Sequence, residues 1–589
     1  MTRGPIATQH ASGRSLQLSG ESLINLWIEP GPQGGRSPAT LIGAPNAKAF
    51  ASGMGSGPIR AMIDALGYVW ALSAGTVYYI DSAGTATVAG GITVDTTGWA
   101  CMATDGETVA ITANRSGYVI SGQAASGTLT LTGNAVDAET VIIGSTTYTW
   151  RTAITAAAYD VLIGASASAS LDNLISAINR TGAAGIAYSE ATTRHTSVSA
   201  APGAGDTMVV TALTAGVSGN TIATTETMTN GSFGAATLGA GVNFTVSAIT
   251  DPDFPGATSV DFADGYMLFT TPDSGQWFIS DLYDSGTYDA LDFTTAEAAP
   301  DNNVRLIVDH GEVLIFGEKS IEPYSNQGAA DFPFVRVPGG RIERGCAAKA
   351  SVAKMDNSVF FVGDDRIVYR LDRYNPVKIS TPELDHALDI ATASEVGDAE
   401  AWTYLKSGHH VYVLSFGEQT WCYDAQTQKW HRRASGSAAD QRWRCQWGVM
   451  AFGKMLVGDS EGGNVGELDL ATHTDFGQTR RCVARTPNLY ADGAIARMST
   501  IELEAEMGVG LSTGQGSDPQ VMMRTSDDGG KTWSPERWAG LGKIGQTRQR
   551  ARWHRCGSFR QRTVEFAVSD PVDVILFGWR HETVGGVVT

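Results

Sequence analysis

The sequence predicts a mainly β protein: a β-propeller-like body with a C-terminal β domain and a small inserted α+β module. Glycine is in excess, with 69 of 589 residues, about 12% against a usual ~7%. Charged residues are few, at 17% against a usual ~25%. Short apolar runs rich in β-branched and aromatic residues alternate with Gly, Asp and Ser, which is typical of strands and turns. The hydrophobic content of 42% excludes a chain that is disordered by composition.

Residues 1–117 predict the first part of the propeller-like body. The runs 68–72 and 76–80 have strand composition. They are separated by Ser73-Ala-Gly75, which predicts a hairpin loop. The run 108–112 predicts a further strand.

Residues 118–246 differ in composition, since aromatic residues are sparse and Ala, Thr, Gly and Ser dominate. Leu171, Leu174, Ile175 and Ile178 have the spacing of one apolar helical stripe. The flanking segments have strand composition. We therefore predict a compact α+β module inserted into the body, because long insertions in surface loops cost little closure entropy.

Residues 247–474 return to glycine-bounded strands and predict the remainder of the propeller body. Residues 420–424 form a strand-like run that ends in Tyr-Asp, and a polar turn and Trp430 follow. This order resembles a kelch-like blade. A propeller blade takes roughly 40–45 residues, so the predicted body is long enough for about six to seven blades. Residues 475–589 then form a separate C-terminal β domain.

Charge and local patterns exclude several classes of protein. The net charge of −19 argues against a general nucleic-acid binder, because phosphate neutralisation requires clustered Lys and Arg. No secretory signal and no membrane span are predicted. The six cysteines form no CxxC pair, which predicts buried, reduced thiols. No HxH or HExxH pattern is present, and we predict no catalytic, cofactor-binding or metal-binding residues.

One motif is specific, and it is structural. Residues 526–533 match the Asp-box pattern S-x-D-x-G-x-T-W, through Ser526, Asp528, Gly530, Thr532 and Trp533. In such a hairpin the Asp accepts hydrogen bonds from turn amides, and glycines permit positive φ. Sialidases carry several copies away from their catalytic site, and one is found here. We predict a structural hairpin.

Residues 543–562 form the one basic run of the chain. The seven positive charges include Arg548, Arg550, Arg552 and Arg555, and no acidic residue interrupts them. Arg548, Arg550 and Arg552 alternate, so in a strand they share one face. The run could contact nucleic acid or an acidic neighbouring subunit, or pair with carboxylates of the same chain. We favour self or subunit pairing, and name Arg548, Arg550, Arg552 and Arg555 as candidate subunit-interface residues.

Ten segments of the sequence carry a resemblance to a known family: residues 23–30, 41–46, 57–62, 69–72, 277–282, 289–293, 314–324, 342–346, 552–557 and 560–566. They are similar to segments of the packaged-DNA stabilisation (tail nozzle or tail hub) proteins of short-tailed bacteriophages. Two positions depart from the family pattern. Gly43-Ala-Pro-Asn46 replaces Gly-Thr-Pro-Gly, and Phe559-Arg-Gln-Arg562 lacks an Asp before the last Arg.

The resemblance implies a structural virion protein without cofactors and without enzyme activity. It would form a homo-hexameric ring below the portal and its adaptor, retain packaged DNA and form the channel for DNA ejection. The implied partners are the portal-adaptor proteins, a tailspike or tail fibre, a tail needle, and double-stranded DNA that passes the lumen without specific binding. Assembly would occur in the host cytoplasm. An acid-rich lumen would suit such a role, since it lowers affinity for phosphate.

Two alternatives remain open from the residues alone. A receptor- or glycan-binding propeller would have a concave aromatic pocket, for which Trp430, Trp443 and Trp447 are candidates. A glycoside hydrolase would place two carboxyl groups about 5–9 Å apart in a cleft.

Overall fold

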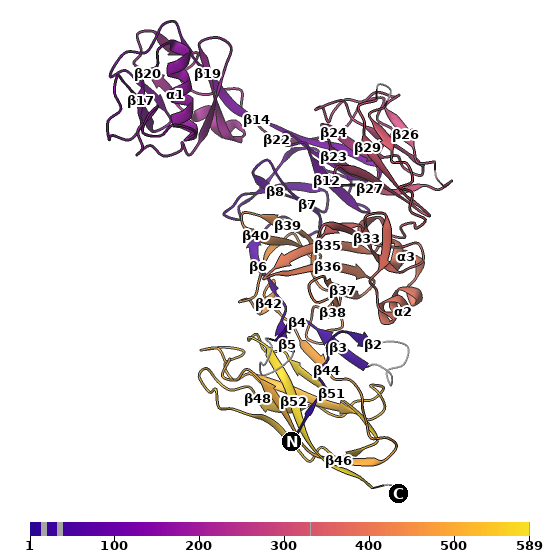
Figure 1. The fold of residues 1–589 in the computed structure, drawn as a ribbon. Helices are drawn as coiled ribbons and strands as arrows, with labels where there is room; N and C mark the ends of the chain where they lie inside the picture. The colour runs from indigo at the N-terminus through magenta and orange to yellow at the C-terminus, as the bar shows by residue number, and fades with distance from the viewer. Residues whose placement is uncertain (13–19, 32–38, 298, 330–331, 588–589) are drawn as a thin grey trace.

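The computed structural model describes residues 1–12, 20–31, 39–297, 299–329 and 332–587. It shows an elongated, mainly β molecule with a propeller in the middle, a β-sandwich at one end and an inserted module that projects from the other end (Figure 1). The predicted fold class is confirmed.

Seven four-stranded blades make up the propeller in the described part of the chain. Blades 1 to 3 contain, in order, β7 (Ile59–Ala65), β8 (Tyr68–Ser73), β9 (Thr76–Ile80) and β10 (Ala86–Val88); β12 (Ala100–Thr104), β13 (Val109–Ala113), β14 (Ser116–Leu131) and β22 (Val242–Ala248), with β11 (Gly90–Gly91) beside β22; and β23 (Val260–Ala263), β24 (Tyr266–Thr270), β25 (Gln276–Ile279) and β26 (Phe293–Thr295).

The remaining blades follow the same order from the inner to the outer strand. Blades 4 to 7 contain β27 (Asn303–Asp309), β28 (Glu312–Gly317), β29 (Ile321–Asn326) and β30 (Phe334–Arg336); β31 (Ala353–Met355), β32 (Ser358–Val362), β33 (Val368–Asp372) and β34 (Asn375–Lys378); β35 (Glu400–Lys406), β36 (His409–Phe416), β37 (Gln419–Asp424) and β38 (Lys429–Arg433); and β39 (Cys445–Ala451), β40 (Lys454–Asp459), β41 (Val465–Asp469) and β6 (Asn46–Ala51). The connections include η2 (Lys349–Ser351), α2 (Pro382–Ile390) and α3 (Ala393–Gly397).

The ring of blades is closed by the N-terminal strand β6, which pairs antiparallel with β41 and completes blade 7. An apolar cluster fills each of the seven interfaces between neighbouring blades, within the residues described. A middle strand is therefore covered on both faces, and every residue of β32 is buried. This explains why such strands have continuous apolar sequences rather than alternating ones.

The β-sandwich packs two sheets around a single apolar cluster. One sheet has the order β4 (Leu26–Pro30), β5 (Ala39–Gly43), β52 (Ile575–Val587), β46 (Ile495–Ala505) and β49 (Ala551–His554), with β1 (Thr2–Gly4) and β50 (Ser558–Phe559) at its sides. The other has the order β3 (Gly20–Ile24), β44 (Cys482–Arg485), β51 (Gln561–Val568), β47 (Gln520–Ser526) and β48 (Arg537–Gly540), with β2 (Ala11–Ser12) and β45 (Leu489–Tyr490). The short hairpin of β42 (Thr474–Asp475) and β43 (Gln478–Thr479) precedes it.

The N-terminal strands lie elsewhere than the prediction for residues 1–117 places them. Strands β1, β4 and β5 pair within the sandwich, and β3 joins the two domains because it pairs with β38 of blade 6 and with β44. The first contribution to the propeller is β6. Short apolar strands fit either domain equally well, so the sequence alone does not reveal which sheet they join.

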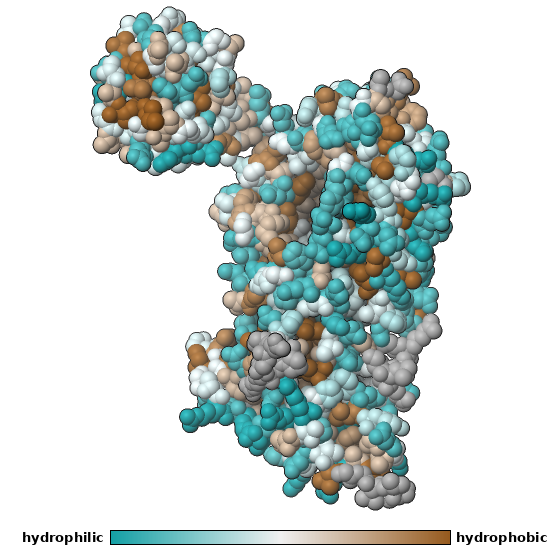
Figure 2. Space-filling view, viewed as in Figure 1, coloured by the Kyte–Doolittle hydropathy of each residue, from teal (hydrophilic) through white to brown (hydrophobic). Residues whose placement is uncertain are grey.

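The inserted module leaves the propeller between β14 and β22, the two outer strands of blade 2. Residues 118–121 of β14 pair with 245–248 of β22, so these ends of the predicted 118–246 segment belong to the blade. The module contains β15 (Thr140–Ile143), β16 (Thr146–Arg151), β17 (Asp160–Leu162), α1 (Ala167–Asn179), β18 (Val198–Pro202), β19 (Thr207–Ala215), η1 (Val217–Thr221), β20 (Thr224–Glu226) and β21 (Gly231–Phe233). It has its own core, and apolar residues gather on one side of its surface (Figure 2).

Helix α1 lies where the apolar stripe predicts it. Leu171, Leu174 and Ile178 are buried in the module core, and Ile175 is partly buried against it. Ser166 caps the first turn by accepting a hydrogen bond from the Ala169 amide.

A buried polar cluster fixes the propeller to the sandwich. The Asn25 side-chain amide donates to the carbonyls of Ala434 and Arg481, each at 2.9 Å, and its oxygen accepts from Arg433 Nε at 3.1 Å. Arg433 is fully buried and stacks 3.9 Å above the ring of Trp443. Buried polar groups of this kind require matched partners, so this cluster specifies one relative position of the two domains.

Candidate functional site

The arginine-rich segment leads into β49 at the edge of the sandwich, and only Arg552 of the three alternating arginines lies on this strand. Glu502, directly across on β46, accepts from Arg550 at 2.7 and 2.9 Å and from Arg552 at 2.8 Å. Partial burial raises the pKa of Glu502, but the hydrogen bonds and charges of the two arginines outweigh it and lower that pKa overall. Arg550 and Arg552 are therefore paired within the chain.

Arg548 and Arg555 differ from this pair. Both side chains are exposed, and neither has a hydrogen-bond or ion-pair partner among the described residues. Arg548 precedes β49, and Arg555 follows it with φ at 58°. An unpaired, exposed guanidinium is free to bind a carboxylate of another molecule, so these two arginines remain candidates for an intermolecular contact.

A charged groove of about 790 Å³ adjoins Arg548. Glu502 and Glu504 of β46 and Glu506, which follows that strand, line it together with Arg550 and Arg580. Arg580 forms an ion pair of 2.7 Å with Glu504. The groove therefore has alternating charges that are largely balanced within the chain.

The Asp-box residues form the turn between β47 and β48. Asp528 accepts hydrogen bonds from the Ser526 and Thr532 hydroxyls at 2.7 and 2.6 Å and from the Lys531 and Thr532 amides at 2.9 Å. These bonds hold the pKa of Asp528 well below its usual range. Gly530 has φ at 97°, a conformation that favours glycine.

Trp533 closes the same turn. Its Nε1 donates to the Gly530 carbonyl at 3.1 Å, and the guanidinium groups of Arg485 and Arg524 lie 4.9 and 4.7 Å from the centre of its ring. Each contact of the motif is internal to the sandwich, and the arrangement is that of a structural turn.

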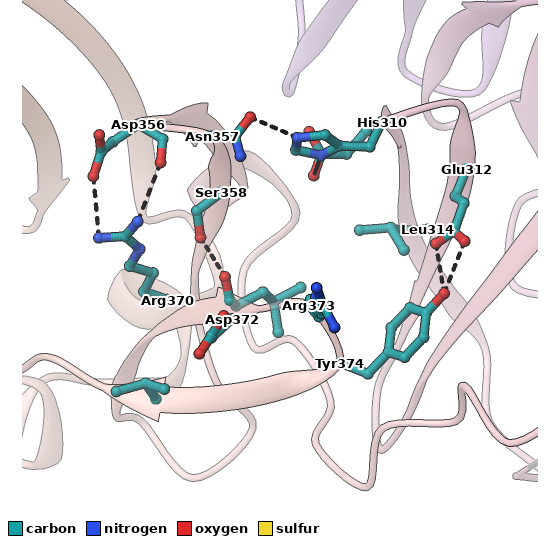
Figure 3. Close-up of a pocket in the computed structure, with 13 residues that line it drawn as sticks. His310, Glu312, Leu314, Asp356, Asn357, Ser358, Arg370, Asp372, Arg373 and Tyr374 are labelled. Atoms are coloured by element: carbon teal, nitrogen blue, oxygen red, sulfur yellow. Dashed lines mark hydrogen bonds and ion pairs between the residues drawn. The ribbon is translucent and has the colours of Figure 1, made fainter.

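A second groove, of about 750 Å³, lies between blades 4 and 5 (Figure 3). Tyr374 donates to both carboxylate oxygens of Glu312 at 2.8 Å, and Arg370 pairs with Asp356 at 3.1 Å. Burial, followed by the hydrogen bond to Glu312, raises the pKa of Tyr374 to about 12. Sequence patterns do not single out this groove, because its residues come from three separate turns.

Histidine 310 occupies one wall of this groove. Its Nε2 lies 2.6 Å from Asn357 Oδ1, and its Nδ1 lies 2.8 Å from Asp309 (Figure 3). These two side chains raise the pKa of His310. Asp309, Glu312 and Asp356 are thus all engaged by neighbouring side chains, and Asp372 is the fourth acid of the lining.

The predicted aromatic pocket does not form from its proposed residues. Trp430 and Trp443 are at most 1% exposed, within the clusters between blades 5 and 6 and between blades 6 and 7. Trp447 is half-buried against the cluster between blades 7 and 1. These tryptophans serve the propeller core, so this basis for glycan binding is absent.

The cysteines are free and mostly buried, as the sequence predicts. All six cysteines lack disulfides; Cys101 is half-buried and the other five are buried. Burial raises the pKa of five of the thiols, including Cys422 to about 12. None of the helices formed by the described residues is long and apolar enough to cross a membrane. Those residues also contain no group of three or more His, Cys, Asp and Glu that could hold a metal ion.

The fold defines a class of protein in which a closed β-propeller is joined rigidly to a C-terminal β-sandwich. Two family models match the chain, the bacteriophage P22 Gp10 β-propeller over residues 184–473 and the bacteriophage P22 Gp10 β-sandwich over residues 481–580. The chain belongs to this family of phage packaged-DNA stabilisation, or tail nozzle, proteins. It is a structural protein of the phage tail and a virion component.

Solved structures resemble the chain only distantly. The computationally designed Ika8 protein is 11% identical, with 72% of this chain and 100% of that chain covered and a TM-score of 0.32. Kluyveromyces lactis Hsv2 is 10% identical, with 64% and 97% covered and a TM-score of 0.23. An exo-β-1,3-galactanase from Phanerochaete chrysosporium is 9% identical, with 54% and 94% covered and a TM-score of 0.21. No curated protein matches the chain.

Proposed function

We propose that the chain forms a hexameric nozzle ring below the portal and adaptor, which retains packaged DNA and forms the channel for its ejection. The observation that carries this proposal is the match of both domains, in order, to the Gp10 propeller and sandwich. Adaptor proteins, a tailspike or tail fibre and a tail needle would be its partners, and assembly would occur in the host cytoplasm.

The charge distribution supports a channel that does not bind DNA. Residues 475–589 contain 15 Lys and Arg against 13 Asp and Glu, so residues 1–474 account for the whole negative excess. A propeller surface of this kind repels phosphate, because binding to DNA requires neutralisation by cations. We therefore expect the acidic propeller, rather than the sandwich, to line the lumen.

The ring is tested by measuring the mass of the purified protein with and without its adaptor. A closed ring of identical subunits needs two different complementary patches on each chain. We expect the Arg548→Ala/Arg555→Ala double variant to shift the mass distribution from hexamers to smaller species, because both arginines are unpaired within the described chain.

The matched control is Arg550→Ala, which removes an arginine that already pairs with Glu502. This variant should keep the hexamer. A stable monomer of the unmodified protein, with and without adaptor, would contradict the ring. An intact ring in the double variant with loss of DNA retention would show that these arginines face DNA instead.

A further inference from the structure

Blade 3 and the segments that flank it are rich in acidic residues and poor in basic ones. Between residues 195 and 304 the chain contains no Lys or Arg, although 13 Asp and Glu occur there. Eleven of these acids lie in residues 251–301, which form blade 3 and its connections. Two of them are neutralised by other blades, Asp273 by Arg115 of blade 2 and Asp261 by Lys354 of blade 5.

Four of the remaining acidic residues lie on the loop that connects β25 and β26. Asp281, Asp284, Asp289 and Asp292 lie on this loop, and no ion pair of the described residues involves them. Burial and the charges of Asp289 and Asp281 raise the pKa of Asp292. The carboxylates are thus close enough to repel one another, and a cation from outside would relieve that repulsion.

Large apolar side chains stand on the same loop. Leu282, Tyr283, Leu291 and Phe293 are 54%, 71%, 78% and 42% exposed. Large apolar side chains that are exposed beside charged groups favour an interaction site. The apolar contacts also argue against DNA as the occupant, because protein contacts to the DNA backbone are mainly polar and positively charged.

The loop is fixed in place. Tyr288 is 6% exposed and packs against Phe254, Phe269 and Phe278 with ring centroids 5.0–6.0 Å apart. Ser285 contacts Thr108 of blade 2 at 2.8 Å. Binding to a loop that is already ordered loses little conformational entropy.

The position of the loop determines which partner can reach it. The sandwich joins the propeller at blades 6 and 7, and blade 3 lies opposite them in the ring, at the far end of the molecule (Figure 1). The basic run of this chain lies on the sandwich, where Arg550 and Arg552 are already paired with Glu502 and where the proposed function assigns Arg548 and Arg555 to contacts within the ring. A second copy is therefore a poor complement to this loop.

We infer that the 281–293 loop of blade 3 is a docking surface for another virion protein, which presents a Lys- or Arg-rich segment with aliphatic or aromatic side chains. This inference rests on the proposed function and names one of its partner surfaces. The basic groups pair with the loop carboxylates, while the apolar side chains cover Leu282, Tyr283, Leu291 and Phe293.

The first test places a photo-crosslinking amino acid at position 291 in assembled phage particles and maps the crosslinked peptide by mass spectrometry. The expected product is a Lys- or Arg-rich segment of a different virion protein. A crosslink to a second copy of this chain, a crosslink to DNA, or no crosslink at all would each overturn the inference.

The second test measures how much of that partner remains in virions that carry Leu291→Ser/Asp281→Asn. We expect at least a tenfold loss of the partner, because Leu291 and Asp281 would contact it directly. Both side chains are exposed, so the fold should not depend on them. The matched control Leu405→Ser/Glu418→Gln changes an exposed leucine and an exposed acid on blade 6 and should retain the partner. Full retention in the first variant would contradict the inference, whereas a failure of the proposed function would appear separately as loss of the hexamer.

Discussion

Asn25 is the residue on which the junction between the propeller and the sandwich depends. It is fully buried, has φ at 58°, and forms hydrogen bonds with blade 6 and with the start of the sandwich. Asparagine suits the position because it tolerates the left-handed region and carries both a donor and an acceptor. No apolar residue supplies both properties.

We expect Asn25→Ala to lower the free energy of unfolding by about 3 kcal/mol or more. It leaves Arg433 Nε and the Ala434 amide without an acceptor, and each buried unsatisfied group costs roughly 1–3 kcal/mol. Urea unfolding followed by tryptophan fluorescence measures the change. Asn114→Ala is the control, since Asn114 also has positive φ but is exposed. An equal loss in both variants would contradict a special role for the buried bonds.

Two buried histidines near the same junction predict how stability responds to acid. Burial and the nearby Arg433 cation lower the pKa of His431 to about 3, and burial with Arg432 and Arg485 lowers that of His10 well below its usual range. An unfolded histidine titrates near pH 6.5. Below that pH the unfolded chain binds a proton that the native chain does not, so stability falls as pH drops.

For His431 we expect the free energy of unfolding to fall by up to ~1.4 kcal/mol per pH unit between about pH 6 and pH 4. His431→Gln should flatten this slope, as measured by melting temperatures across that range. His310→Gln is the control of opposite sign, because the pKa of His310 is raised and its protonation favours the native state. A slope that is unchanged in His431→Gln would contradict the assignment.

At the scale of elements, a close backbone approach fixes the passage from blade 4 to blade 5. A Cβ atom at Gly345 would lie 2.0 Å from the Glu318 carbonyl oxygen and 2.2 Å from its carbon. Backbone atoms cannot move aside as a flexible side chain can. Glycine is therefore required here because a side chain would not fit, and not because of its backbone conformation.

Gly345→Ala should lower the free energy of unfolding by about 1–3 kcal/mol, the usual cost of overpacking. Calorimetry of the propeller transition measures this. Gly397→Ala serves as the control, because its added Cβ meets nothing within 4 Å and its backbone angle is ordinary. If the two variants melt alike, the close approach does not constrain the blades.

Individual strands are predictable because their signal is local. The run 76–80 matches β9 end to end, and the stripe on α1 follows from its 3.6-residue period. The closing strand β6 and the partner of Arg550 are not predictable in this way. Each depends on a contact across many residues of the chain, for which a single sequence carries no signal.

The docking loop of blade 3 has a signal of a different kind in the sequence. A stretch of 110 residues without Lys or Arg, from 195 to 304, can be recognised from the order of the residues alone. Its meaning depends on the fold, because only the folded chain exposes Leu282 and Leu291 on the same loop as the carboxylates.

At the scale of the whole molecule, the three parts are joined very differently. The propeller and sandwich share the strand β3 and the buried cluster around Asn25, so they act as one unit. The inserted module is joined through β14 and β22 and has a core of its own. Coupling between parts follows shared packing, so the module should fold and unfold independently of the rest.

Replacing residues 123–242 by a short Asn-Gly turn should therefore leave the propeller and sandwich folded and the hexamer intact. The strand pair 118–121 with 245–248 remains in blade 2 and keeps its place in the ring, and Asn-Gly favours the tight turn that such a pair needs. The melting temperature of the main transition and the mass of the ring measure the outcome.

Leu174→Ala, in the core of the module, is a second variant that avoids a new chain connection. It should destabilise only the separate unfolding transition of the module, by about 2–5 kcal/mol. Loss of the ring in both variants would show that the module takes part in contacts between subunits.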